Sequence, residues 1–368
     1  MTDQRTISPS TLNKWLQDGH DVTILDIRPA RERAEWFIPH SIHFNAYEQL
    51  KAKAQHPFRG LFIDKDVPVV VVCAAGRTSA IGAEVLANAG YDACSLEGGM
   101  KHWTFAWNTA DQHFNNFKLT QVRRSAKGCL SYIISSQQEA VIIDASLPVE
   151  VYEQLLKGSD LTLKFVVETH IHADHLSRSK ALADQFNVPV LLPVPNKVEF
   201  PFTPLDDEAD LSVGAVKIKI YSSPGHTPES KTLLVDDQVL LTGDTLFTDG
   251  VGRPDLKASE EESLNKAKLL YQSLKTLSSL PDALLVFPAH TSKPVDYDHV
   301  PVSRTIGEIK TKLSLLQLGE DEFTADILQR IPPAPANYLT IIERNLTGDL
   351  AGVDPVELEA GANRCAVS

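Results

Sequence analysis

The chain has 368 residues, more than one hydrophobic core usually supports, so two domains are expected. Its formal net charge of −13 argues against nonspecific binding to nucleic acid or to an anionic membrane surface. No apolar run approaches the roughly 20 residues that span a bilayer, and the polar start at residues 1–5 is unlike a signal peptide. We therefore expect a cytoplasmic protein with small-molecule partners; the sequence leaves open whether it forms a homo-oligomer.

Residues 1–103 alternate between helical and strand patterns, which predicts a small parallel α/β sheet. Residues 104–117 show neither the helical nor the strand period, and we interpret them as a linker. The expected elements are helices at 8–17 and 77–88 and strands at 22–26, 67–72 and 93–96.

Residues 118–368 differ from the first 103 residues in that longer strand patterns occur in pairs. Two strand-rich halves with outer helices predict an αββα sandwich, so the expected fold is an α/β domain followed by an α+β domain. The expected strand pairs are 128–135 with 139–144, 216–222 with 231–235, and 238–242 with 283–287, and helices are expected at 149–157, after Asp174 and at 261–277.

Four metal-competent side chains crowd together after the apolar run at 165–167: His170, His172, Asp174 and His175. Buried together without a cation, such groups would cost several kcal/mol, so their clustering indicates a metal site. We expect both early histidines where a strand leaves the sheet, and Asp174 and His175 at the start of the next helix.

Three later residues each follow another apolar run: His226, Asp244 and His290. Each is expected at the same edge of the sandwich. The complete set resembles the HxHxDH, His, Asp and His motifs of the metallo-β-lactamase superfamily.

The resemblance implies two alternatives for the metal. In the glyoxalase II branch, two Zn(II) ions bridged by Asp244 would activate a hydroxide that attacks a thioester. In the persulfide dioxygenase branch, one Fe(II) would bind His170, His226 and Asp244, which leaves positions open for a sulfur substrate and dioxygen. The remaining motif members, His172, Asp174, His175 and His290, would then orient the ligands.

The segment Gly250-Val251-Gly252-Arg253-Pro254-Asp255 favours the iron alternative, because it resembles the GxGRxD loop of persulfide dioxygenases. Pro254 stands where that family more often has Thr. Since a guanidinium group suits carboxylates and other anions, we expect Arg253 to bind the anionic thiol substrate or to anchor the carboxylate network of the site.

A cysteine lies between an apolar strand at 70–72 and an Ala-rich helical pattern: Cys73, followed by Gly76, Arg77 and Thr78. Backbone N–H groups and the positive end of the helix would stabilise a thiolate or persulfide anion there. The other cysteines, Cys94, Cys129 and Cys365, are scattered without a CxxC pair, which argues against disulfides and a thiolate zinc site. We interpret Cys94 and Cys129 as core residues and assign no role to Cys365.

The region around Cys73 resembles a single rhodanese domain. The resemblance rests on Leu25-Asp26-Ile27-Arg28, Phe37-Ile38-Pro39, the Cys73 loop and Leu96-Glu97-Gly98-Gly99. Two positions depart from the family: His40 replaces its usual Gly, and Thr78 stands where it usually has Arg. The resemblance implies sulfur transfer at Cys73 and Arg77, with Gly76 and Thr78 shaping the loop.

Together the two resemblances predict a persulfide dioxygenase fused to a sulfurtransferase. A low-molecular-weight persulfide, with glutathione persulfide as the leading candidate, would be oxidised by dioxygen to sulfite and thiol, while Cys73 exchanges sulfane sulfur with sulfite or thiosulfate. One alternative is a zinc-dependent glyoxalase II-like thioester hydrolase with an accessory rhodanese module. Another is a non-enzymatic sulfur-responsive protein that uses Cys73 as a sensor.

Overall fold

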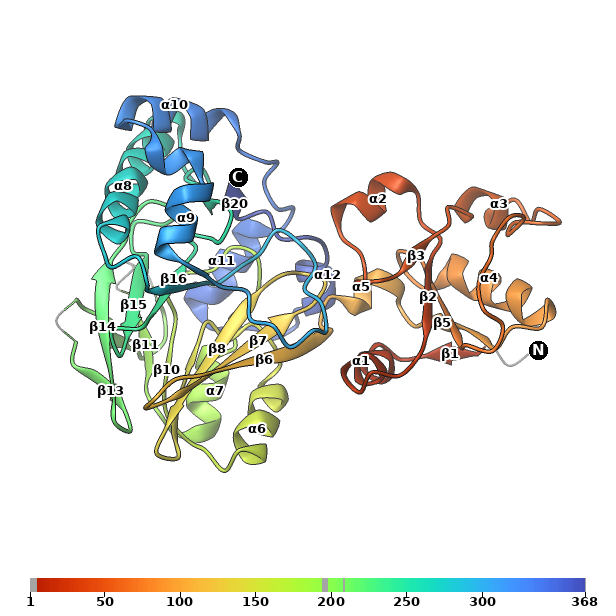
Figure 1. Ribbon diagram of the computed structural model, residues 1–368, viewed down its shortest axis with the longest axis horizontal. Coiled ribbons are helices and arrows are strands. Elements are labelled where there is room, and N and C mark those ends of the chain that lie inside the picture. Colours follow the sequence, from red (N-terminus) through yellow and green to blue (C-terminus); the bar gives the residue numbers. More distant parts are fainter. Residues whose placement is uncertain (1–4, 194–197, 208, 368) are drawn as a thin grey trace.

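The computed structural model describes residues 5–193, 198–207 and 209–367; the polar start at 1–4 lies outside them. The chain forms a smaller N-terminal unit, red to orange in Figure 1, beside a larger one that contains the rest. Among the described residues, no helix is both long and apolar enough to cross a membrane.

The N-terminal unit is a parallel sheet in the order β1-β5-β4-β2-β3. Its central strand β4 is an uninterrupted run of buried valines, as expected for a parallel strand covered on both faces. The strands are β1 (Thr6–Ile7), β2 (Thr23–Asp26), β3 (Ile42–His43), β4 (Val69–Val72) and β5 (Ala93–Leu96), and the helices are α1 (Pro9–Gln17), α2 (Ala30–Glu35), α3 (Tyr47–Lys51), α4 (Arg77–Asn88) and α5 (Gly99–Trp103).

The larger unit contains two stacked sheets, ordered β12-β11-β10-β9-β8-β7-β6 and β13-β14-β15-β16-β18-β19. The first sheet comprises β6 (Trp107–His113), β7 (Lys118–Arg124), β8 (Leu130–Ser136), β9 (Glu139–Ile143), β10 (Thr162–Val167), β11 (Val190–Leu192) and β12 (Thr203–Pro204). The second comprises β13 (Leu211–Val213), β14 (Val216–Ser222), β15 (Lys231–Val235), β16 (Val239–Gly243), β18 (Leu285–Pro288) and β19 (Arg304–Thr305).

The main core lies between these sheets, where Leu119 and Ile134 belong to the same apolar cluster as Ile218 and Leu233. Helices cover both outer faces, so the predicted αββα sandwich is confirmed. The helices that cover the first sheet are α6 (Val149–Gly158) and α7 (Ser179–Phe186); those over the second are α8 (Glu260–Ser278), α9 (Ile306–Lys312) and α10 (Glu320–Gln329).

The expected linker is wrong for residues 107–113, which form the edge strand β6 and pair with β7 along their whole length. Their burial alternates as in a strand, but one inward position is the polar Asn108. Its side-chain oxygen accepts a hydrogen bond from Arg123 Nε at 2.5 Å. Because Arg123 satisfies the side-chain oxygen of Asn108, a polar residue can occupy this buried position. The strand therefore lacks the alternation of apolar and polar residues by which a strand is predicted.

The two units share a packed boundary. Ala126 and Tyr297 of the larger unit pack into the cluster that contains Met100 and Trp103 of the smaller one. Tyr297 also donates a hydrogen bond from its hydroxyl group to Asn13 Oδ1 at 2.6 Å. The units are therefore held by apolar and polar contacts as well as by the connecting chain.

The C-terminal segment returns to this boundary through α11 (Tyr338–Thr347) and α12 (Pro355–Glu359), with α12 beside α5 (Figure 1). It ends in β20 (Ala366–Val367), which pairs with β17 (Val251–Gly252). Glu359 anchors the segment: its carboxylate lies 2.5 Å from Arg124 Nη1 and 3.0 Å from Arg178 Nη2. The Arg124 and Glu359 side chains are both fully buried.

Replacing Glu359 with Ala would leave two guanidinium groups without their carboxylate. Breaking a buried ion pair from one side costs about 3–5 kcal/mol. We expect Glu359→Ala to lower the free energy of unfolding by about this amount in urea denaturation followed by circular dichroism.

Glu357→Ala is the matched control. Glu357 belongs to the same helix, but its side chain is 60% exposed and pairs with Lys101 at the surface, so its loss should cost less than about 1 kcal/mol. Equal destabilisation by both substitutions would contradict the anchoring role of Glu359.

Candidate metal centre and sulfur-transfer loop

The HxHxDH residues lie in the loop between β10 and α7. The expectation that Asp174 and His175 begin the next helix is wrong, because α7 begins only at Ser179. The loop is held from outside: Asn345 of α11 donates hydrogen bonds to the backbone oxygens of His172 and His175, each at 2.9 Å. These contacts keep the loop extended over the sheet edge before the helix starts.

Three residues from separate loops converge on one point: His170 after β10, His226 between β14 and β15, and Asp244 after β16. Asp244 Oδ2 lies 3.7 Å from His170 Nε2 and 3.6 Å from His226 Nε2. Two atoms bound to one ion at about 2.1 Å are at most about 4.2 Å apart, so these atoms can share an ion.

Hydrogen bonds on the far side of each imidazole leave these Nε2 atoms free. His226 Nδ1 lies 2.8 Å from the carbonyl oxygen of Arg253, which can only accept, so Nδ1 carries the proton. His170 Nδ1 lies 2.9 Å from Thr169 Oγ1, whose hydroxyl group already donates to Asp144 Oδ2 at 2.9 Å. Each arrangement assigns the proton to Nδ1 and presents the lone pair of Nε2 to the shared point.

The charges at this point suit a cation. Burial lowers the pKa values of His170 and His226, so both imidazoles are neutral. Burial alone would raise the pKa of Asp244, but nearby histidines, His290 first, hold it below its usual range. Two neutral imidazoles and one carboxylate are a suitable ligand set for a divalent metal ion.

Two of the converging atoms, His170 Nε2 and Asp244 Oδ2, are buried without a hydrogen-bond partner among the described residues. Buried polar atoms are normally satisfied, and a bound cation would satisfy both. The residues present therefore fit a metal ion.

Close packing fixes the backbone at Asp244. Gly252 passes so near that a Cβ atom there would lie 1.9 Å from the backbone oxygen of Asp244 and 2.9 Å from the Cβ atom of His226. Only glycine allows this approach.

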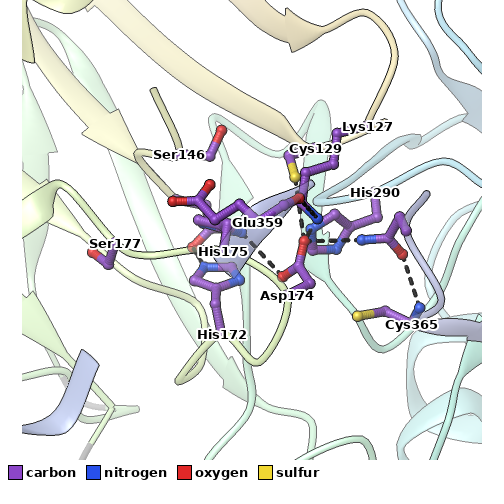
Figure 2. A network of polar contacts seen from close by, with 12 residues as sticks. Lys127, Cys129, Ser146, His172, Asp174, His175, Ser177, His290, Glu359 and Cys365 are labelled. Atoms are coloured by element: carbon purple, nitrogen blue, oxygen red, sulfur yellow. Dashed lines mark hydrogen bonds and ion pairs between the residues drawn. The ribbon is translucent and has the colours of Figure 1, made fainter. Parts of the chain in front are cut away.

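The motif residues Asp174, His175 and His290 form a second cluster, shown in Figure 2. Asp174 Oδ1 lies 3.0 Å from His175 Nδ1, and its Oδ2 atom lies 2.9 Å from His290 Nε2. His290 Nδ1 in turn lies 2.5 Å from Asp244 Oδ1. His290 thus stands between two carboxylates, which raise its pKa well above the usual value although burial opposes the shift.

Sequence reasoning missed three residues that complete this cluster. Cys129, interpreted as a core residue, donates from its thiol to Asp174 Oδ2 at 3.2 Å, and Asn363 donates to the same oxygen at 3.0 Å. Cys365, to which no role was assigned, lies with Asp244 and His290 in a group of potential ligands. Asn363 and Cys365 arrive on the C-terminal segment, whose long-range return no local pattern reveals.

His172 faces a separate pair of carboxylates. Its Nε2 atom lies 2.8 Å from Glu168 Oε2 and 3.2 Å from Asp144 Oδ1. The two acids raise the pKa of His172 well above its usual value, although burial opposes the shift. Asp144 was missed as a site residue, although it directly follows the apolar run of β9 and could have been found on the same grounds as Asp244.

Of the two roles expected for Arg253, its contacts favour anchoring carboxylates over binding substrate. Its guanidinium group is buried and paired with Asp255 at 2.7 and 2.8 Å, and Nη1 donates to the carbonyl oxygens of Pro333 and Arg364. Because these contacts occupy the guanidinium group, Arg253 positions its own loop. Its backbone carbonyl oxygen accepts a hydrogen bond from His226.

The Cys73 loop connects β4 to α4 as expected. Cys73 is 2% exposed, with Sγ 3.2 Å from Ser79 Oγ. Gly76, at φ +82°, precedes α4 as its N-cap, so the loop makes a left-handed turn there. Arg77 is exposed at the first helical position and Thr78 is buried. The loop rests on α5, where Met100 N donates to the Cys73 carbonyl oxygen at 2.9 Å.

Known proteins match both units. Residues 8–106 match the rhodanese-like domain, and residues 124–290 match the metallo-beta-lactamase superfamily. Mitochondrial persulfide dioxygenase ETHE1 of Mus musculus is 33% identical over 211 residues, which cover 54% of this chain and 75% of that protein. The chain belongs to the metallo-β-lactamase superfamily.

Two further proteins are similar to this superfamily enzyme. A hydroxyacylglutathione hydrolase of Prochlorococcus marinus (strain MIT 9301) is 30% identical, covering 49% of this chain and 75% of that protein. The crystal structure of ETHE1 from Myxococcus xanthus is 28% identical, with a TM-score of 0.55, and covers 62% of this chain and 98% of that one. The metallo-β-lactamase domain is thus similar to both an oxidative and a hydrolytic enzyme, and the N-terminal unit is a rhodanese-like domain.

Metal content tests the three-residue centre. Asp244→Asn removes the negatively charged ligand, and His226→Ala removes one imidazole, so both variants should lose most of the bound metal. Plasma emission spectrometry of protein purified without added metal measures this. His113→Ala, at an exposed position on β6, is the control and should retain the wild-type content. Full metal content in Asp244→Asn would exclude the assigned centre.

Proposed function

We propose that the metallo-β-lactamase domain oxidises a low-molecular-weight persulfide, with glutathione persulfide as the leading candidate, at a single Fe(II). The balanced reaction is RSSH + O2 + H2O → RSH + H2SO3, in which the outer sulfur loses four electrons to dioxygen. The observation that carries this proposal is the three-donor face of His170, His226 and Asp244.

Two histidines and one carboxylate on one face are the ligand pattern of non-haem Fe(II) oxygenases. A ferrous ion held there would supply open positions for the terminal sulfur and for dioxygen. The chain's own residues orient the ligands: Thr169 and the Arg253 carbonyl group fix the tautomers of His170 and His226, and His290 fixes one oxygen of Asp244.

We infer one ion rather than two, although Cys129, Asp174, His175 and His290 form a second group of potential ligands, in which His175 Nε2 and His290 Nε2 have no hydrogen-bond partner among the described residues. Both oxygens of Asp174 are engaged by protein groups: His175 at Oδ1, and Cys129 and Asn363 at Oδ2. These bonds would have to break or turn before Asp174, His175 and His290 could bind a second ion. We therefore assign these three residues and His172 to orientation of the centre.

We further propose that Cys73 carries sulfane sulfur in a sulfurtransferase reaction of the thiosulfate type. A persulfide on Cys73 would pass its outer sulfur to sulfite, so that Cys–SS⁻ + SO3²⁻ → Cys–S⁻ + S2O3²⁻. A sulfur anion on Cys73 would lie near the positive N-terminal end of α4, and Ser79 Oγ lies 3.2 Å from Sγ. Sulfite is the proposed product of the metallo-β-lactamase domain. This shared compound explains why the two domains would occur in one chain.

Oxygen uptake tests the oxidative proposal. Protein purified anaerobically and loaded with Fe(II) should consume one dioxygen and release one sulfite for each glutathione persulfide added. An oxygen electrode and sulfite chromatography measure both quantities. Zinc-loaded protein that cleaves lactoylglutathione, together with iron-loaded protein that takes up no oxygen, would replace the proposal with the glyoxalase II-like alternative.

Cys73→Ser tests the division of labour between domains. It should abolish sulfur transfer from thiosulfate to cyanide, because a hydroxyl group cannot carry the sulfur, and should leave oxygen uptake with glutathione persulfide within about twofold of wild type. Cys94→Ser, in the neighbouring strand β5, is the matched control and should retain both activities. Equal loss of both activities in Cys73→Ser would contradict two independent sites.

A further inference from the structure

Two serine hydroxyl groups form a chain of hydrogen bonds behind the sulfur of Cys73. Ser79 Oγ lies 3.2 Å from Cys73 Sγ and 2.8 Å from Ser95 Oγ. Ser95 Oγ in turn lies 3.3 Å from the carbonyl oxygen of Gly76, which can only accept a hydrogen bond. The chain therefore starts at the sulfur, passes from the first turn of α4 to β5, and ends at the turn that precedes α4.

Both serine side chains are buried in an apolar layer. Ser79 is 0% exposed and Ser95 is 1% exposed. Ala83, one turn beyond Ser79 on α4, and Ala93, two residues before Ser95 on β5, belong to the same apolar cluster as Cys73. A buried hydroxyl group is unfavourable unless it is hydrogen-bonded, whereas alanine would occupy either position without that requirement. Two linked hydroxyl groups in this layer thus indicate a function at the sulfur.

The direction of these hydrogen bonds depends on whether Sγ carries a proton. In the thiol, S–H can donate to Ser79, Ser79 to Ser95, and Ser95 to the carbonyl oxygen of Gly76. A thiolate can only accept, so Ser79 must turn its hydroxyl hydrogen to Sγ, and Ser95 must donate to Ser79. The inner sulfur of a persulfide on Cys73 also lacks a proton, and it requires the same reversed direction.

The reversed direction leaves no acceptor in this chain without a donor. When Ser95 turns to Ser79, the carbonyl oxygen of Gly76 still accepts from the backbone N–H of Ala80 at 3.3 Å. An acceptor without a donor would oppose the reversal, and Ala80 prevents this. The hydroxyl groups only rotate, and the thiol proton leaves to water, so no proton passes along the chain.

The charged side chains on the elements around the loop are exposed or bonded to other groups. Among the described residues, Ser79 is the one whose side chain forms a hydrogen bond with Sγ. The exposed side chains are Arg77, Glu84 and His102, and the bonded ones are Glu97 with Thr6, Lys101 with Glu357, and Asp26 with Arg28 and Arg33.

We propose that Ser79 and Ser95 form a reversible hydroxyl relay that stabilises Cys73 when its sulfur carries no proton, either as the thiolate or as the persulfide. The inference rests on the proposed function only in naming sulfur transfer as the use of this thiolate. Ser79 is a catalytic residue, because it touches the reacting sulfur, and Ser95 is a positioning residue that acts through Ser79.

The relay acts when sulfite removes the outer sulfur, in Cys–SS⁻ + SO3²⁻ → Cys–S⁻ + S2O3²⁻. The sulfur of sulfite forms a bond to the outer sulfur, and the S–S bond to Cys73 breaks. The electron pair of the broken bond stays on Sγ as a new negative charge. Because the persulfide has already set the reversed direction, Ser79 donates to this charge without further rotation.

A pH titration of the thiolate absorbance of the full-length protein tests the relay without any substrate. The absorbance of Cys73→Ser is subtracted at each pH, so the remaining change belongs to Cys73. In Ser79→Ala the midpoint should rise by about one pH unit, because a hydrogen bond to a charged group is lost. In Ser95→Ala it should rise by about a third of that, because Ser79 remains but loses its own donor.

Ser10→Ala is the control, because Ser10 is an exposed serine of the same unit on α1, and its loss should leave the midpoint unchanged. Transfer of sulfur from thiosulfate to cyanide supplies a second readout. Below the midpoint, Ser79→Ala should be about tenfold slower than wild type, and the rate should recover as rising pH deprotonates Cys73. A purely structural defect would slow the variant equally at every pH.

Three results would overturn the relay: a wild-type midpoint in Ser79→Ala, a wild-type midpoint in Ser95→Ala, or a rise in Ser10→Ala as large as in Ser79→Ala. Circular dichroism of each variant should match wild type, since each substitution removes a single oxygen atom. The titration needs no turnover, so it separates this inference from the proposed reaction. The expected midpoints in a protein that transfers no sulfur would retain the relay and remove the sulfurtransferase assignment.

Discussion

The contact on which the centre depends is the imidazole of His290 between two buried carboxylates. Its Nδ1 atom lies 2.5 Å from Asp244 and its Nε2 atom 2.9 Å from Asp174. Such burial of charge is tolerated only when the groups pair closely. The pairing fixes one oxygen of Asp244, so the other is directed at His170 and His226. Because β16 and β18 are parallel neighbours, Asp244 and His290 emerge together from the same sheet edge.

The C-terminal segment completes this arrangement and also reaches the other unit. Asn363 donates a hydrogen bond to Asp174, and Glu359 pairs with Arg124 and Arg178 behind the cluster. On its opposite side, α12 contacts α5, whose backbone N–H groups bind the carbonyl oxygens of the Cys73 loop. One short segment therefore supports both the metal centre and the element that packs behind the Cys73 loop.

Local patterns were sufficient where a residue's position depends on its own stretch of chain. The HxHxDH loop, the strands that precede His226, Asp244 and His290, and the Cys73 turn before α4 all follow from apolar runs that end in polar residues. Patterns failed where a partner comes from elsewhere. The strand β6 was not predicted because Asn108 is polar, and the Arg123 side chain that binds it lies on the next strand. Asn363 and Cys365 lie more than 100 residues from the HxHxDH loop, and only the folded chain brings them to it.

Arg253 shows which of two expected roles the fold favours. Its guanidinium group could bind an anionic substrate or a carboxylate of the protein, and Asp255, two residues further along the chain, pairs with it. A charged residue in a motif is thus a weak predictor of ligand binding when the motif also carries its counter-ion.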